Sequence, residues 1–536
     1  MKRIYIKTIL WPTLLVALMC ITSCSDFLNE ENLTQLSETQ VMSDEKLAEI
    51  NLKSIYSSFK NLYKDEQCWF LLQGTDEIQC GALQAKDANT AAWDYCDGAM
   101  NSENNYVKKS WEMRWSVITS AAKIVRAMKK TNPPLGSKAA QLAGEAAFLR
   151  GFMNYQTAMI WGRIPILDLE KIDAGQLNYG RQPLKDVWQF IINDFTQAAN
   201  MAPTQNDPDR VTCFAGWLML ARAYMSAPQE TGLRDFAKAK EALDHIISSG
   251  KYQLLDNYND LWDYNKDASK EVILTTTFTA ARNYANQVQF QIGSRACAKD
   301  FGDACYFSGY DHSVPTIHAY ESVDKGGVWE KGDTRREYSI RYDFTYNGRI
   351  PTLKGLEWEG LSPEDHDELL PHIKKYEDYR TDRGSGLGIN NMWLSGKNIP
   401  IIRYADVLLC YAECLNELGQ TALAETYVNI VRDRAFEGAQ PPAVRWNGLS
   451  KETFRENLQD ERIRELFAEN WRRYDLVRTG KWSERLKKYN KWGSISASKG
   501  TFKEHIQYWP IPLTELNQNK DMRTADNLFD QNEGYQ

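Results

Sequence analysis

Apolar residues recur at intervals of three and four through much of the chain, which is the pattern of amphipathic helices packed on a core. The clearest case lies between Ile399 and Gly419, where one helical face carries Ala405, Leu408, Leu409, Ala412 and Leu415. Gly419 is a typical helix stop, and helical periodicity resumes from Thr421 to Arg434. Two helices joined this closely form an antiparallel hairpin. We interpret this hairpin as the best-preserved unit of a helical scaffold.

The same periodicity predicts further helices on both sides of that hairpin. They cover residues 44–62, 106–130, 138–161, 184–199, 212–225, 237–248 and 454–476. Trp217, Ala221 and Tyr224 match the first-helix offsets of a tetratricopeptide-type pair, although the loop to the partner helix at 237–248 is longer than standard. We therefore expect several helix pairs interrupted by insertions rather than a regular solenoid.

The middle of the chain has a different character. Residues 271–278 (EVILTTTF) are β-branched and predict a short strand. From 279 to 397 few periodic patterns are sustained, and Gly, Asp, Tyr and Trp are frequent. A stretch this long favours a loop-rich insertion with a function of its own. We expect a single body at 41–536, with a helical scaffold at 41–278 and 398–536 and the insertion at 279–397.

The N-terminus has the pattern of a lipoprotein leader. A basic start (Lys2, Arg3 and Lys7) precedes the apolar run from Leu10 to Ile21, which is shorter than the ~20 residues that a membrane-spanning helix needs. Residues 21–24 (ITSC) resemble a bacterial lipobox, so we predict a signal peptide at 1–23, an acylated Cys24 and a polar tether at 24–40. The alternative is plain secretion with cleavage nearby.

Composition and cysteine spacing limit the possible partners, disulfides and metal sites. The net charge of −7 makes nucleic acid and anionic membrane surfaces poor partners, whereas 17 Trp and 27 Tyr supply more flat surface than a core usually needs. Export permits disulfides, and either Cys68–Cys80 or Cys297–Cys305 could pair. Cys410 and Cys414 lie one helical turn apart without accompanying His, which favours buried thiols over a metal site.

Several segments together resemble the SusD/RagB family of outer-membrane nutrient-uptake lipoproteins over nearly the full chain. The matching stretches are CSDFLNE (24–30), GEAAFLRGFMNYQTAMIWGRIPIL (144–167), DVWQFIINDFTQAANMAP (186–203), IIRYADVLLCYAECLNELG (401–419), NIVRDRA (429–435), ERIRELFAENWRRYDLVRTG (461–480), YWPIPLTELNQN (508–519) and QNEGY (531–535). Asn470 stands where the family usually has Gly, and we expect only a local change of turn there.

This resemblance implies a mainly α fold, in which four tetratricopeptide-like helix pairs support a loop-rich ligand-binding region with short strands. It also implies a non-catalytic protein that binds oligosaccharide or polysaccharide and delivers it to a SusC-like TonB-dependent transporter. Peptide capture, as in the RagB branch, is the alternative. No cofactor is expected, and a structural cation is left open.

Catalysis has little support in the sequence. A glycosidase needs two carboxylates at a defined separation in a cleft, whereas the side chains of the adjacent Asp76 and Glu77 are expected to diverge. The six histidines form no metal-protease or nucleophile–base pattern. The charged residues of the family motifs are instead expected to form partly buried ion pairs; these are Arg150, Arg403, Asp406, Arg432 and Arg434.

Ligand binding is expected to rest on aromatic side chains, because sugar rings present apolar C–H faces that stack on them. In the family, the region of residues 87–105 and the loops before the Asp333-Thr334-Arg335 element commonly line the binding face. The candidates there are Trp93, Tyr95, Tyr306, Phe307, Tyr310 and Trp329. Trp111, Trp115, Trp188 and Trp217 lie on helical apolar faces and are expected in the core.

Overall fold

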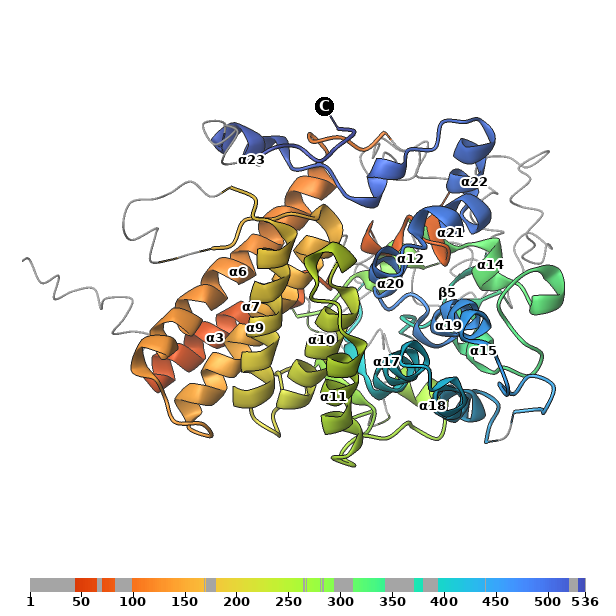
Figure 1. The fold of residues 1–536 in the computed structure, drawn as a ribbon, viewed down its shortest axis with the longest axis horizontal. Coiled ribbons are helices and arrows are strands. Elements are labelled where there is room, and N and C mark those ends of the chain that lie inside the picture. The colour runs from red at the N-terminus through yellow and green to blue at the C-terminus, as the bar shows by residue number, and fades with distance from the viewer. Residues whose placement is uncertain are drawn as a thin grey trace, which may run out of the picture.

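A succession of packed helices forms most of the protein in the computed structural model (Figure 1). The structure describes residues 44–64, 70–81, 99–167, 169, 180–263, 266, 268–279, 281, 284–293, 312–342, 371–378, 394–438, 440–519 and 529–535. Helices in the first half are α3 (Glu45–Asn61), α6 (Asn105–Thr131), α7 (Lys138–Trp161), α9 (Leu184–Met201), α10 (Cys213–Ser226) and α11 (Phe236–Ile247). Each matches a predicted helix within two residues at either end.

The second half resumes helical structure after the insertion. Its helices are α17 (Tyr404–Glu417), α18 (Thr421–Ala435), α19 (Lys451–Leu466), α20 (Arg472–Arg478), α21 (Trp482–Tyr489), α22 (Lys491–Ser498) and α23 (Leu513–Gln518). Neighbours in space follow chain order from α6 through α7, α9, α10 and α11 to α17 and α18. The pairs α10–α11 and α17–α18 are those that the tetratricopeptide offsets predicted, and the mainly helical fold is confirmed.

Helix α7 lies at the centre of the first half and is buried on nearly every side. It packs on α3, α6 and α9, which explains why its apolar residues lie all round the helix rather than on one stripe. The helix ends at Gly162, whose φ of 74° is a conformation that glycine adopts without strain.

Within the described residues the strands are short and pair in three antiparallel ribbons: β1 (Ile78–Cys80) with β3 (Ser313–Pro315), β2 (Val272–Thr276) with β6 (Ile399–Arg403), and β4 (Ile340–Arg341) with β5 (His372–Ile373). The described parts of the insertion otherwise hold only short elements, namely α12 (Val288–Ile292), α14 (Ile317–Tyr320), α15 (Arg335–Ser339) and the 3₁₀ turn η6 (Val323–Lys325). Further 3₁₀ turns in the described part of the scaffold are η3 (Gln229–Thr231), η4 (Tyr258–Leu261) and η9 (Glu504–Gln507).

Two helix predictions need correction. The stretch from Ile399 to Gly419 is not wholly helical, because residues 399–403 form β6 and pair with β2, which lies within the predicted strand at 271–278. The predicted helix 454–476 is two helices, since Ala468 (φ 59°) and Asn470 (φ 65°) are left-handed and interrupt it between α19 and α20. Asn tolerates this conformation better than most residues, which fits its place where the family has Gly.

The core contains the tryptophans that the helical pattern assigned to it. Trp111 and Trp188 are buried, while Trp115 and Trp217 are partly buried and pack against the same core. The indole of Trp217 also stacks on His245 of α11, with 3.9 Å between ring centroids.

Cysteine states are partly defined. Cys410 and Cys414 are buried free thiols, as predicted, and Cys213 is a third. Cys80 is disulfide-bonded, and its partner lies outside the described residues.

Candidate functional site

Two segments are predicted to carry ligand-binding aromatics. The first begins, and the second ends, at the ribbon formed by β1 and β3. Trp93, Tyr95, Tyr306, Phe307 and Tyr310 all lie outside the described residues, but the chain on either side of them is described. Strand β1 leads into the first segment, and β3 follows the second. The backbone N–H of Gly81 donates to the carbonyl of His312 at 3.2 Å, so the last described residue before one segment contacts the first described residue after the other.

Side-chain contacts fix this ribbon to the scaffold. Gln73 donates through its amide to the His312 carbonyl at 2.8 Å, and Thr316 donates to the Asp76 carbonyl at 2.6 Å. Trp482 of α21 donates its indole N–H to the Gly74 carbonyl at 3.1 Å. The ribbon at the base of both aromatic segments is therefore held by α21 as well as by its own strand pairing.

Trp329 does not belong with the other aromatic candidates. Only 1% of this residue is exposed, and its indole N–H donates to the Ala319 carbonyl at 2.6 Å. A ring buried to this extent offers no face to a sugar, so we remove Trp329 from the ligand-binding set. The sequence showed only that Trp329 precedes the Asp333-Thr334-Arg335 element, and this position is compatible with a buried indole as well as with an exposed one.

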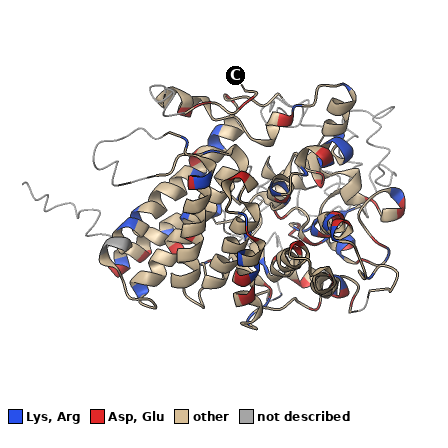
Figure 2. Cartoon of the chain, in the orientation of Figure 1, with Lys and Arg blue, Asp and Glu red and all other residues tan. Residues whose placement is uncertain are grey.

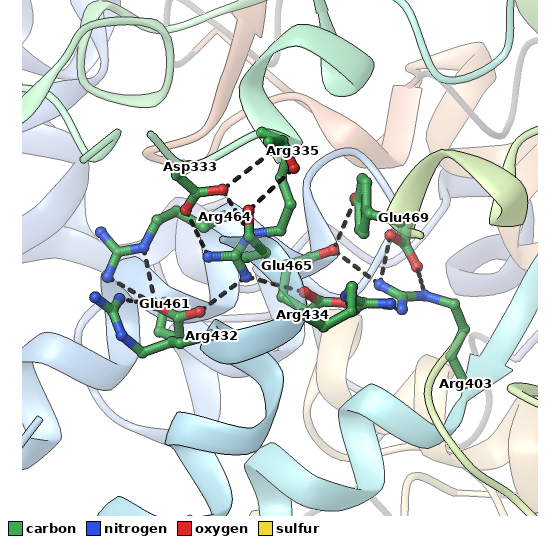
Figure 3. Close-up of polar contacts among 12 residues, drawn as sticks. Asp333, Arg335, Arg403, Arg432, Arg434, Glu461, Arg464, Glu465 and Glu469 are labelled. Atoms are coloured by element: carbon green, nitrogen blue, oxygen red, sulfur yellow. Dashed lines mark hydrogen bonds and ion pairs between the residues drawn. The ribbon is translucent and has the colours of Figure 1, made fainter. Parts of the chain in front are cut away.

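The insertion is joined to the scaffold by a buried ionic network (Figure 3). Arg335 of α15 forms ion pairs with Asp333 at 2.6 Å, Glu461 at 2.8 Å and Glu465 at 2.9 Å. All four side chains have no exposed area, and the two glutamates lie on α19. The Asp333-Thr334-Arg335 element therefore fixes the insertion to the scaffold.

This network continues through the arginines that the family motifs singled out. Arg403 contacts Glu271, Glu465 and Glu469 at 2.7–2.9 Å, and Arg434 shares Glu271 and Glu465. Among the described residues, its cations are Arg335, Arg403, Arg432, Arg434, Arg464 and Lys375, and its carboxylates are Glu271, Glu330, Asp333, Glu461, Glu465 and Glu469. Figure 2 shows both charge signs interleaved around α19. The predicted ion pairs of Arg403, Arg432 and Arg434 are confirmed.

A second buried cluster joins the α17 hairpin to its neighbours. Asp406 binds Arg222 at 2.8 Å and Arg462 at 2.7 Å, and Asp475 binds both of these arginines as well. Arg478 completes the cluster by pairing with Glu413 and Asp475. The predicted ion pairs of Asp406 and of Arg150, which contacts Asp194 at 2.6 Å, are thus also confirmed.

A third cluster lies beneath β1. The Asp76 carboxylate contacts the guanidinium groups of Arg472 and Arg485, whereas Glu77 accepts a hydrogen bond from the Ala468 N–H at 3.3 Å. The two adjacent carboxyl groups thus have separate partners, as expected. Burial raises the pKa of Glu77 to about 8, while for Asp76 the two arginines outweigh burial and lower the pKa.

The electrostatics of these carboxylates suit structure rather than proton transfer. Burial alone would raise the pKa of Asp406, but Arg222 and Arg462 lower it to about 2. The pKa values of Glu461, Glu465 and Asp475 are lowered in the same way. A general acid must hold a proton near neutral pH, which these groups do not, and the 1% exposure of Glu77 leaves it no substrate contact. Among the described residues, no group of three His, Cys, Asp or Glu side chains could hold a metal ion.

The sequence interpretation missed most of the carboxylate partners. Glu271, Glu465, Glu469 and Asp475 were not singled out, although three of them lie within the motif at 461–480. A signal was present: Glu461, Arg462, Arg464 and Glu465 follow one another on a helix that also carries Leu458, Ile463 and Leu466. Charges so closely interleaved with core residues indicate paired burial.

Comparisons with known proteins agree with this architecture. The model of the SusD family matches residues 270–535, and a second model, described as starch-binding and associating with the outer membrane, matches residues 26–225. Among curated relatives, a SusD-like protein P2 of Formosa agariphila is 28% identical over 396 residues, which are 71% of this chain and 73% of that protein. The starch-binding protein SusD of Bacteroides thetaiotaomicron is 24% identical over 518 residues, 87% and 88% of the two chains.

Solved structures share the fold. A SusD homologue of Bacteroides thetaiotaomicron superposes with a TM-score of 0.72 at 20% identity and covers 94% of this chain and 100% of its own. A laminarin-binding SusD-like protein gives a TM-score of 0.69 at 22% identity, with 91% and 99% covered. Within the described residues, no helix is long and apolar enough to cross a bilayer. The two matched regions, the helix pairs and the ionic network between insertion and scaffold lead to one conclusion: the chain belongs to the SusD family.

Proposed function

We propose that this protein is a non-catalytic glycan-binding lipoprotein of the outer membrane. It captures oligosaccharides at the cell surface by stacking them on Trp93, Tyr95, Tyr306, Phe307 and Tyr310 and passes them unchanged to a SusC-like TonB-dependent transporter. Cys24 carries the lipid that holds it at the membrane. Neither nucleic acid nor a cofactor takes part.

One observation carries this proposal above the others. Two relatives that cover most or nearly all of the chain are named for binding starch and laminarin, both of which are glucans. The hydrogen bond between Gly81 and His312 supports the grouping of the aromatics, because it places the ends of both aromatic segments at one ribbon. The pairing of the buried carboxylates with arginines supports binding without chemical change.

The test is calorimetry of the purified chain from residue 24 against a polysaccharide panel and a peptide pool. We expect heat of binding with at least one glycan and none with the peptides. Trp93→Ala should weaken glycan binding at least tenfold, since each stacked ring contributes a large apolar contact. Trp217→Ala is the matched control, because that indole is on the scaffold and stacks on His245. Binding of peptides alone would favour the RagB-like alternative, and release of reducing ends from a glycan would contradict the non-catalytic assignment.

A further inference from the structure

A cavity of about 550 Å³ opens on the scaffold, separate from the ribbon that bears the aromatic segments. Its walls come from the connection between α9 and α10, from the chain between α11 and β2, and from the start of β6. This volume is within the range of small-molecule sites, which is about 300–1,000 Å³. The cavity is therefore large enough to receive a few sugar units.

The charge of the lining is unusual for an acidic chain. Four lysines line the cavity together with two aspartates; these residues are Lys251, Lys266, Lys270, Lys397, Asp207 and Asp263. Lys266 and Lys270 are exposed and form no ion pair with any described residue. The Lys251 ammonium lies over the Phe214 ring at 5.3 Å and donates to the Thr204 carbonyl, and neither group neutralises its charge. Lys251, Lys266 and Lys270 thus form no ion pair with a described carboxylate, whereas the Lys397 ammonium donates to the carbonyls of Lys375 and Glu377.

The remaining lining combines amides with apolar surface. Gln205, Asn206 and Asn398 supply donors and acceptors, and Leu261, Val272, Ile273 and Pro400 supply apolar contacts. Amides for hydroxyl groups and apolar groups for C–H faces are the two kinds of partner that a sugar ring requires.

Trp262 forms a fixed part of the cavity wall. This residue lines the cavity and is 5% exposed, and its indole Nε1–H has no hydrogen-bond partner in the described part of the chain. Its ring is held in place by Tyr376, with 5.8 Å between centroids, and by the Lys375 ammonium at 4.8 Å. A buried N–H without an acceptor is destabilising, and this one has almost no exposed area, so a ligand in the cavity does not reach it.

From these observations we infer that the cavity is a second carbohydrate site, selective for acidic oligosaccharides that carry carboxylate or sulfate groups. Lys251, Lys266 and Lys270 would pair with the anionic substituents, while the amides bind hydroxyl oxygens. This inference rests on the proposed glycan-binding function and names the class of glycan. Because the lysines at the rim are exposed, their contribution is small per charge and is screened by salt.

The test compares a neutral oligosaccharide with uronate and sulfated oligosaccharides of equal length, by calorimetry at low and at high sodium chloride concentration. The acidic probes should bind more tightly than the neutral probe at low salt and lose that advantage at high salt. Lys266→Gln with Lys270→Gln should weaken acidic binding roughly three- to tenfold. Lys46→Gln with Lys185→Gln is the control, because both lysines are exposed, do not line the cavity and give the same charge change.

Each outcome has a defined meaning. The two acidic probes distinguish a uronate site from a sulfate site. The inference is overturned if the acidic probes bind with equal affinity to the Lys266→Gln, Lys270→Gln variant and to the Lys46→Gln, Lys185→Gln control. This holds even if Trp93→Ala weakens the binding of neutral glycans. Absence of binding to every glycan in the panel refutes the proposed function itself. Lysine-dependent acidic binding that survives Trp93→Ala supports the second site and separates it from the aromatic one.

Discussion

Arg403 illustrates how single charged residues hold this protein together. Its guanidinium contacts three carboxylates at 2.7–2.9 Å and is 1% exposed. Removing one member of such a set leaves its partners buried without a counter-charge, which costs more than the pair itself contributes. The network around α19 is therefore sensitive to single substitutions, even though replacing an entire network with apolar residues can leave stability unchanged.

We predict that Arg403→Gln lowers the free energy of unfolding by about 3–5 kcal/mol. Denaturant unfolding followed by far-UV circular dichroism measures this loss. Arg445→Gln is the control, because Arg445 also binds a carboxylate, that of Asp433 at 2.7 Å, but 46% of its side chain is exposed. The control should change stability by about 1 kcal/mol or less. Equal effects of the two substitutions would contradict a structural role for burial here.

The free energy of unfolding is expected to depend on pH because of Glu77. Its pKa is about 8 in the folded protein against 4.5 for an unperturbed glutamate. Between these pH values the folded state keeps a proton that the unfolded state has released, so stability falls as pH rises through this window. The slope from this group is at most about 1.4 kcal/mol per pH unit.

Glu77→Gln removes this titration and keeps an oxygen that can accept from the Ala468 N–H. The variant should therefore gain stability relative to the wild type when urea unfolding is measured at pH 8 rather than pH 5. Glu452→Gln serves as control, because that side chain is 76% exposed on α19. A stability difference between Glu77→Gln and wild type that is the same at both pH values would refute the prediction.

Close crossings between helices depend on glycine in the first half of the scaffold. A Cβ on Gly144 of α7 would lie 2.3 Å from the Ala202 backbone nitrogen, at the end of α9. A Cβ on Gly216 of α10 would lie 2.6 Å from the Ala199 nitrogen of α9. Helix α9 is thus approached closely from two sides, and this contact sets how α7, α9 and α10 lie against one another.

Gly144→Ala tests this geometry. In an isolated helix, Ala is favoured over Gly by about 1 kcal/mol, whereas overpacking costs about 1–3 kcal/mol. Because the clash is with backbone, which cannot move aside as a side chain can, we expect net destabilisation, measured as a lower thermal midpoint. Gln141→Ala, at a partly exposed position of the same helix, should change stability by about 0.5 kcal/mol or less. A rise in the midpoint of Gly144→Ala would contradict the crossing.

Periodicity predicted the long helices well because each of them buries a continuous apolar face. It merged α19 and α20 into one helix at 454–476. The left-handed backbone of Ala468 breaks the helix, but a backbone conformation leaves no mark on the pattern of apolar residues. It also could not separate β6 from α17, because Ile399, Ile401 and Ile402 are buried in a strand and would suit a buried helix equally well. Trp329 shows the same limit within the candidate site: a sequence gives the residue type, whereas exposure depends on what packs over it.

At the level of the complete protein, apolar packing and buried ion pairs act together. Both hold the helices of the scaffold, as in the pairs of Asp406 with Arg222 and Arg462, and further ion pairs join the insertion to the scaffold through Arg335 and α19. The predicted aromatic segments arise from a ribbon that is fixed by the scaffold, so ligand contacts can vary while the body keeps its shape. The proposed attachment to the membrane is a separate requirement, because the predicted tether at 24–40 precedes the predicted body.

This separation predicts that Cys24→Ala releases the protein from the membrane without loss of glycan binding. Acylation of Cys24 would supply more than one chain, which gives stable anchoring, whereas the tether alone is polar and acidic. Fractionation of cells followed by immunoblotting measures the release, and mass spectrometry of the wild-type N-terminus should show the added acyl mass on Cys24. Cys20→Ala is the matched control, since this cysteine lies within the predicted leader and should leave attachment unchanged. If Cys24→Ala remains in the outer-membrane fraction, the lipid anchor is refuted; if the released protein no longer binds glycan, the tether and the binding region are not independent.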